Sequence, residues 1–161
     1  MVRLEQSADK AEDLRLMVES ARAMTEGEED SICVLANISA VVKAYLPDIN
    51  WAGFYIRRGE QLVLGPFQGL PACTRIEMGK GVCGTAAAEA RSVVVEDVHG
   101  FPGHIACDAA SNSEMVVPLF RGGEVWGVLD VDSPLFSRFG PDEQEALDAV
   151  GGLIDAFLDT I

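Results

Sequence analysis

The sequence predicts an α+β domain in which a mainly antiparallel β-sheet is flanked by helices. Helical periodicity is concentrated at the two ends of the chain, in residues 10–46 and 141–161. The region between them, residues 50–136, consists mainly of strand-like runs joined by glycine-containing turns. Segregated helices and hairpin strands indicate an α+β fold. At 161 residues, with 48% hydrophobic residues and no internal repeat or linker, the chain is expected to form one domain with its own core.

Two helices are predicted at the start of the chain. Apolar residues recur at helical spacing across Lys10–Met24. After a glycine and several acidic residues, Asp30 or Ser31 is the expected N-cap of a second helix that runs to about residue 46. Cys33 falls inside this helix and is expected to be a small buried or half-buried residue. The residues expected to face inward from the second helix are Ile32, Leu35, Ile38, Val42 and Leu46.

The first hairpin is predicted at Asn50–Ile56 and Gln61–Phe67. The first of these runs is rich in aromatic and β-forming residues, and a short polar turn separates it from the second. Because side chains alternate along a strand, Trp51, Gly53 and Tyr55 share one face. Trp51 and Tyr55 are therefore candidates for lining a pocket, although an ordinary place on the sheet face fits the pattern equally well.

The middle of the chain combines irregular segments with one short helix. Cys73 lies in an irregular stretch, residues 69–76. A glycine-rich loop then enters a helix that carries Cys83 near its start and ends near Arg91, and Val93–Val95 follows as a buried strand. Because N–H groups at a helix N-terminus favour negative charge, this position is expected to lower the pKa of the Cys83 thiol.

The second predicted hairpin, Met115–Phe120 and Val125–Val131, determines how three acidic residues are arranged. With a two-residue turn and regular pairing, Glu114 would lie on the opposite face from the acidic residues of the second strand. A longer turn, or a bulge near Pro118, places Glu114 beside Asp132, because proline cannot donate a ladder hydrogen bond. We predict this shifted register, or else a Glu114 that lies before regular pairing begins.

A final helix is predicted from about Pro141 to Ile161. Proline suits the first turn of a helix, and the acidic residues that follow suit the positive end of its dipole. The residues expected to form its inner stripe are Leu147, Val150, Leu153, Ile154, Phe157 and Leu158.

The charge of the chain argues against two classes of partner. There are 12 Lys and Arg residues against 26 Asp and Glu residues, a net charge of −14, whereas binding to nucleic acid or anionic membranes needs basic residues. The N-terminus lacks a signal-like pattern and no apolar run is long enough to span a membrane, so we expect a cytoplasmic protein. In a reducing compartment, four cysteines are expected to be free, catalytic or metal-bound.

Three of these cysteines suggest thiol chemistry. Cys73 and Cys107 lie in irregular segments, and Cys83 lies where a loop enters a helix. One thiolate could attack a substrate, become a sulfenic acid and condense with a second thiol to form a disulfide. Two alternatives stay open: inert core cysteines, or a zinc site in which His104 joins the three sulfurs, although no Cys-x-x-Cys pair is present.

Three carboxylates form the second candidate group. Asp130 and Asp132 share one face of their predicted strand, and the shifted register brings Glu114 beside them. They could be solvated acids at a strand end. Alternatively, they line a pocket that holds an ammonium group and keeps one carboxyl protonated, because crowded like charges raise a pKa.

The residues between Asn50 and Phe136 resemble the free methionine-(R)-sulfoxide reductases, enzymes built on a GAF domain. Several motifs that occur in the same order carry this resemblance. They are Asn50–Tyr55, Leu64–Gly69, Pro71–Ile76, Gly79–Ala87, Phe101–Asp108, Ser111–Glu114 and Gly127–Pro134. The resemblance implies a single GAF domain over residues 1–161.

The resemblance also implies an activity and a set of site residues. The expected reaction reduces free L-methionine (R)-S-oxide to L-methionine without a cofactor or metal, and thioredoxin regenerates the thiols. Cys107 matches the nucleophile, with Cys73 and Cys83 as resolving candidates, although the helix-dipole argument favours Cys83 for attack. The residues that match the substrate pocket are Glu114, Asp130, Asp132, Trp51 and Tyr55.

Two other possibilities remain at this stage. A non-catalytic GAF domain could sense a small molecule or redox state, although such a module needs no resolving thiol. The terminal helices also allow a homodimer without requiring one.

Overall fold

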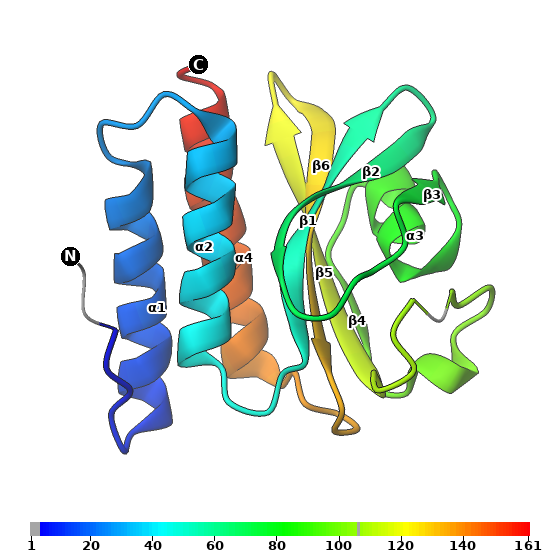
Figure 1. Ribbon diagram of the computed structural model, residues 1–161, viewed down its shortest axis with the longest axis horizontal. Coiled ribbons are helices and arrows are strands. Elements are labelled where there is room, and N and C mark those ends of the chain that lie inside the picture. Colours follow the sequence, from blue (N-terminus) through cyan, green and yellow to red (C-terminus); the bar gives the residue numbers. More distant parts are fainter. Residues whose placement is uncertain (1–3, 106) are drawn as a thin grey trace.

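The computed structural model describes residues 4–105 and 107–161 and shows helices on both faces of one curved sheet (Figure 1). The helices are α1 (Lys10–Thr25), α2 (Ser31–Tyr45), α3 (Gly81–Glu89) and α4 (Pro141–Leu158), with a 3-10 turn η1 (Val98–Gly100). The strands are β1 (Trp51–Arg58), β2 (Gln61–Gln68), β3 (Arg75–Glu77), β4 (Val93–Val95), β5 (Ser113–Arg121) and β6 (Glu124–Ser133).

The sheet has the strand order β3-β2-β1-β6-β5-β4, and every neighbouring pair is antiparallel. The predicted α+β class is therefore confirmed. The short edge strand β3 was expected to be irregular, but Arg75–Glu77 pairs with the start of β2. Three residues are too few to show a periodic pattern, which is why the sequence did not reveal this strand.

Two apolar layers lie on the two faces of the sheet. In Figure 1, α2 and α4 cover one face with α1 outside them, and α3 covers the other. Strand β1 contributes to both layers, because Ala52 and Phe54 pack toward the three long helices while Trp51 and Tyr55 pack toward α3. The α3 side is the one that contains the polar residues of interest. No helix in the described ranges is long and apolar enough to cross a membrane.

Helix α2 corrects two sequence expectations. Its N-cap is Asp30, whose carboxylate accepts hydrogen bonds from the N–H groups of Ile32 and Cys33 at 2.8 and 3.2 Å. Ile32, expected to face inward, is 64% exposed, and Cys33, expected to be at least half-buried, is also exposed. At about 100° per residue, Cys33 lies about 160° around the helix from Leu35 and so faces away from the buried stripe, whereas Ile32 lies only about 60° from Leu35, at the edge of that stripe in the first turn of the helix.

The β5–β6 hairpin has the predicted shifted register. Its turn contains two residues, since Arg121 pairs with Glu124, but the pairing shifts between Leu119 and Phe120. As a result Glu114 lies opposite Asp132. The irregularity lies next to Pro118 in the chain, so a bulge rather than a longer turn brings the acidic residues to one face.

Candidate active site

The eight residues singled out from the sequence come together on the sheet face that α3 covers. A cavity of about 40 Å³ lies between the strands, the start of α3 and the loop before β5. The residues of the set that line it are Trp51, Tyr55, Cys83, Cys107, Glu114, Asp130 and Asp132. The eighth, Cys73, is bonded to Cys107 through a disulfide.

Three buried carboxyl groups form one wall of this cavity. Because Glu114 pairs with Asp132 and Val116 with Asp130, the acidic side chains project from adjacent strands toward α3. Glu114, Asp130 and Asp132 are only 6%, 6% and 8% exposed. No described lysine or arginine forms an ion pair with them, and Asp130 Oδ1 has no hydrogen-bond partner among the described residues. The wall is therefore suited to a cationic group.

Burial raises the pKa of all three carboxyl groups. For Glu114 and Asp132 the pKa lies well above its ordinary value, first because of burial and then because of the charge of Asp130. Burial also raises the pKa of Asp130, while hydrogen bonds with Glu114 and Cys83 oppose the increase. Three crowded carboxyl groups resist losing all their protons, so the wall can also donate a proton.

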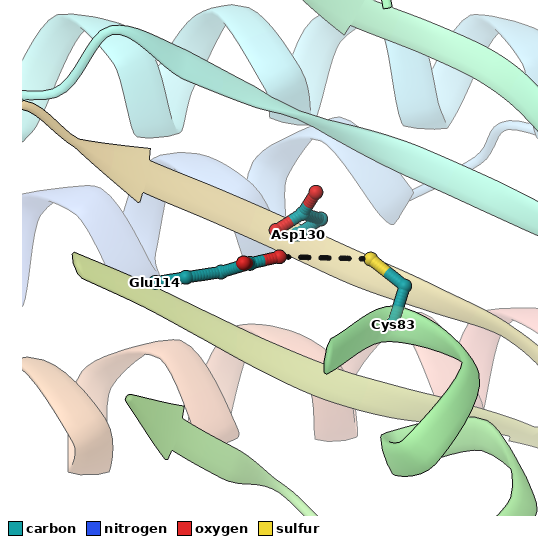
Figure 2. Close-up of side chains that lie close together, drawn as sticks. All are labelled: Cys83, Glu114 and Asp130. Carbon is teal, nitrogen blue, oxygen red and sulfur yellow. Dashed lines mark hydrogen bonds between the residues drawn. The ribbon is translucent and has the colours of Figure 1, made fainter. Parts of the chain in front are cut away.

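Cys83 is a buried thiol that faces this acidic wall. Figure 2 shows its sulfur pointing toward Glu114 and Asp130, and the thiol donates a hydrogen bond of 3.8 Å to Glu114 Oε1. Burial, followed by the neighbouring carboxylates, raises the pKa of Cys83 well above its ordinary value. The expectation of a lowered pKa is thus wrong, because a helix end carries only about half a charge, which does not offset burial beside carboxylates.

The disulfide joins two loops that are distant in sequence. Cys73 follows β2, and Cys107 follows η1; their separation is 34 residues, with 5.3 Å between Cα atoms. Cys83 and Cys33 are the free cysteines. The sequence left open whether Cys73 or Cys83 is the disulfide partner of Cys107. In this structure the partner is Cys73.

The zinc site kept open as an alternative, with Cys73, Cys83, His104 and Cys107 as its ligands, is not assembled. Two of its sulfurs, those of Cys73 and Cys107, are bonded to each other. A different group of possible ligand atoms, from Cys83, Glu114 and Asp130, lies within 4.8 Å of one another. A metal there would have to displace the protons that the raised pKa values favour.

Aromatic side chains from β1 line the cavity beside the acidic wall. Trp51 stacks on Tyr55 and on Phe67, with ring centroids 5.9 and 5.2 Å apart. The Trp51 indole N–H donates to the Leu70 carbonyl at 3.1 Å, and the Tyr55 hydroxyl donates to the Cys73 carbonyl at 2.9 Å. These bonds fix the polar ends of both rings against the β2–β3 loop and leave apolar surface toward the cavity.

Sequence reasoning did not single out a polar group beside the acidic wall. Asp108 and Ser111 both line the cavity. Asn50 donates hydrogen bonds to Asp108 Oδ2 at 2.9 Å and to Ser111 Oγ at 3.1 Å, and so ties the start of β1 to the loop that carries Cys107. All three residues lie within or next to the motifs, but an Asn, an Asp and a Ser in loops carry no distinguishing spacing.

Comparison with known proteins gives a consistent family relationship. The GAF domain family model matches residues 12–156. The chain is 54% identical to the free methionine-R-sulfoxide reductase of Escherichia coli, over 78% of this chain and 76% of that protein. It is 40% identical to the protein of the same name from Saccharomyces cerevisiae, over 91% and 86% of the two chains.

Solved structures agree with these sequence relationships. The free methionine-R-sulfoxide reductase of Neisseria meningitidis, solved in complex with its substrate, matches with a TM-score of 0.93 and 41% identity. The match covers 99% of this chain and 96% of the other.

Proposed function

Because this chain belongs to the GAF-domain family of free methionine-R-sulfoxide reductases, we propose that it reduces free L-methionine (R)-S-oxide to L-methionine. The observation that carries this proposal is a bonded cysteine pair, Cys73–Cys107, at a cavity whose wall holds three buried carboxyl groups that form no ion pair with a lysine or arginine of the described residues. A dithiol supplies two electrons, and the carboxyl groups supply protons and bind an ammonium group.

The reaction starts with Cys107. Its thiolate attacks the sulfoxide sulfur while a carboxyl group of the acidic wall protonates the oxygen, because an unprotonated oxide is a poor leaving group. The S–O bond breaks and the oxygen leaves as hydroxide, so that the Cys107 sulfur is bonded to the sulfur of a methionine sulfonium. The hydroxide then attacks the Cys107 sulfur, methionine leaves with the electron pair of the S–S bond, and Cys107 carries the sulfenic acid. The Cys73 thiol then attacks that sulfur, water leaves, and the disulfide forms. The raised pKa values of Glu114 and Asp132 support a proton donor at this wall.

Recognition of the free amino acid rests on its two charged groups. The ammonium group pairs with Glu114, Asp130 and Asp132. The carboxylate pairs with backbone N–H groups, and the first turn of α3, which lines the cavity at Gly81 and Val82, offers such donors. A methionine sulfoxide residue within a peptide would leave the buried carboxylates unpaired, and a site built for polar groups rejects such a ligand strongly.

Substrate binds to the reduced form of the protein and not to the form that contains the Cys73–Cys107 disulfide. The cavity of about 40 Å³ beside the Cys73–Cys107 bond is far smaller than the ~300 Å³ of small ligand pockets. The two loops joined by the disulfide therefore separate before substrate enters. Thioredoxin is the proposed source of the two electrons that break the bond, and the cycle uses no other cofactor.

The test measures consumption of the two epimers of free methionine sulfoxide with dithiothreitol as reductant. The R epimer should be consumed, while the S epimer and N-acetylmethionine sulfoxide should be consumed far more slowly. Cys107→Ser should abolish turnover. Full turnover by this variant would refute the assignment of the nucleophile, and no consumption of the R epimer by the wild type would refute the enzymatic function. A GAF domain that only senses a ligand would give the second result.

A further inference from the structure

Exposed apolar side chains flank the disulfide on both of its loops. In the described residues, the large apolar side chains that are exposed are Ile32, Leu70, Ile105, Leu135 and Phe136. Leu70 is 65% exposed and lies three residues before Cys73, and Ile105 is 39% exposed and lies two residues before Cys107. At 3.8 Å per residue, their Cα atoms lie within about 11 and 8 Å of those of the nearer cysteine.

Both flanking residues are held in place by their backbones. The Leu70 carbonyl accepts the Trp51 indole N–H at 3.1 Å, and the chain then passes through Pro71, which restricts it further. The Ile105 carbonyl accepts the N–H of Cys107 at 3.0 Å. Leu70 thus presents most of its side chain to solvent, and Ile105, which also lines the cavity, exposes part of its side chain near Cys107.

The charge near the disulfide differs from that of the whole chain. The protein carries a net charge of −14, yet Arg75 and Lys80, close to Cys73 in the chain, are both exposed. Neither forms an ion pair with any described residue. This part of an acidic surface therefore offers unpaired positive charge to an approaching molecule.

We propose that Leu70, Ile105 and Arg75 form the docking surface for the protein dithiol that reduces the Cys73–Cys107 bond. The partner is of the thioredoxin type, with apolar and acidic side chains around its reactive cysteine. This inference rests on the proposed redox cycle and specifies how its reductant is recognised. The half-buried disulfide determines the chemistry of the occupant, because a partner that reduces it within one complex must bring two thiols, and the apolar and basic residues favour a protein over a small thiol.

The thiol–disulfide exchange proceeds in two steps. A thiolate of the partner attacks one of the two sulfurs, the Cys73–Cys107 bond breaks, and an intermolecular disulfide forms while the other cysteine leaves as a thiolate. The partner's second thiol then attacks its own bonded sulfur. Cys73 and Cys107 end as two thiols, two protons having been taken up, and the partner ends as a disulfide.

The test follows this exchange without any sulfoxide, so that it does not depend on the proposed substrate. Oxidised protein is mixed with excess reduced thioredoxin or with dithiothreitol, quenched in acid and assayed for new thiols by maleimide labelling. Leu70→Ser should lower the rate constant with thioredoxin at least about fivefold and leave the rate with dithiothreitol unchanged. Ile32→Ser is the matched control, since Ile32 is 64% exposed on the other side of the sheet, and should react like the wild type.

Arg75→Glu tests the charge. In the wild type the rate with thioredoxin should fall as salt is added, and this variant should be slower and less sensitive to salt. Equal losses with both reductants for Leu70→Ser would overturn the inference, because the residue would then act on the disulfide itself. Unchanged rates in Leu70→Ser, or a wild type that dithiothreitol reduces but thioredoxin does not, would overturn it as well. None of these outcomes depends on whether methionine sulfoxide is the substrate.

Discussion

Reduction of the Cys73–Cys107 bond should lower the free energy of unfolding by about 3–4 kcal/mol. The bond closes a loop of 34 residues. In the chain-entropy model, the loop-closure entropy is about −2.1 − 1.5R ln 34, or roughly −13 cal/mol/K, which corresponds to ~3.8 kcal/mol at 25 °C. Most of this effect arises in the unfolded chain, which the bond keeps compact. The oxidised protein should therefore also show a smaller dependence of stability on urea.

Urea unfolding of the oxidised and reduced wild type, followed by tryptophan fluorescence, measures this difference. Cys73→Ser provides the control, because dithiothreitol should leave its unfolding curve unchanged. Its stability should match that of the reduced wild type. A difference of less than ~1 kcal/mol between the oxidised and reduced wild type would show that the bond does not constrain the unfolded chain as calculated. An equal effect of dithiothreitol on Cys73→Ser would show that the reagent acts elsewhere.

Three further predictions follow from the site and the sheet. Cys83→Ser keeps a hydrogen-bond donor beside Glu114 and should retain turnover within about tenfold of the wild type. Cys83→Ala should lose more turnover and shift the pH profile of kcat/KM, and equal activity of the two variants would contradict a donor role for Cys83. The pKa values of Glu114, Asp130 and Asp132 are raised in the folded protein, so above pH ~4 the folded protein binds more protons than the unfolded chain. The contribution of these groups to the free energy of unfolding therefore falls as the pH rises from ~4 through their folded-state pKa values. In urea titrations across pH 4–8, the free energy of unfolding should fall less steeply with pH in Asp132→Asn than in the wild type. An unchanged slope would count against a raised pKa of Asp132. Gly53→Ala should destabilise the protein by about 1–3 kcal/mol in the same urea assay, because the added alanine Cβ would clash with Cβ of Phe67 on β2. A variant as stable as the wild type would mean that β1 and β2 separate easily.

The sequence predicted the site well where its chemistry depends on local pattern. Alternation along β1 put Trp51 and Tyr55 on one face, and the proline in β5 suggested the register that joins Glu114 to Asp132. Both inferences depend only on strand geometry and on neighbours in the chain. The motifs then supplied the family relationship that the comparisons confirm.

The properties that were missed depend on tertiary surroundings. A lowered pKa of the Cys83 thiol would hold for an isolated helix, whereas the packed sheet buries this thiol against two carboxyl groups. The pairing of Cys73 with Cys107 depends on how two irregular loops meet, which no periodicity encodes. The exposure of Ile32 likewise depends on which side of α2 meets the sheet.

The bulge in the β5–β6 hairpin makes the site depend on the register of these two strands. Trp126 lies between Val125 and Gly127, the residues that pair with Phe120 and Leu119. If Trp126 were kept and the bulge lost, Leu119 would pair with Trp126 and each pair beyond it would shift by one residue; Glu114 would then meet Val131, whose side chain packs in the apolar layer beneath the long helices. A homologue could therefore keep every acidic residue and cysteine of the site and still be inactive. When relatives are compared for this activity, the register of this hairpin should be compared before the identity of its residues.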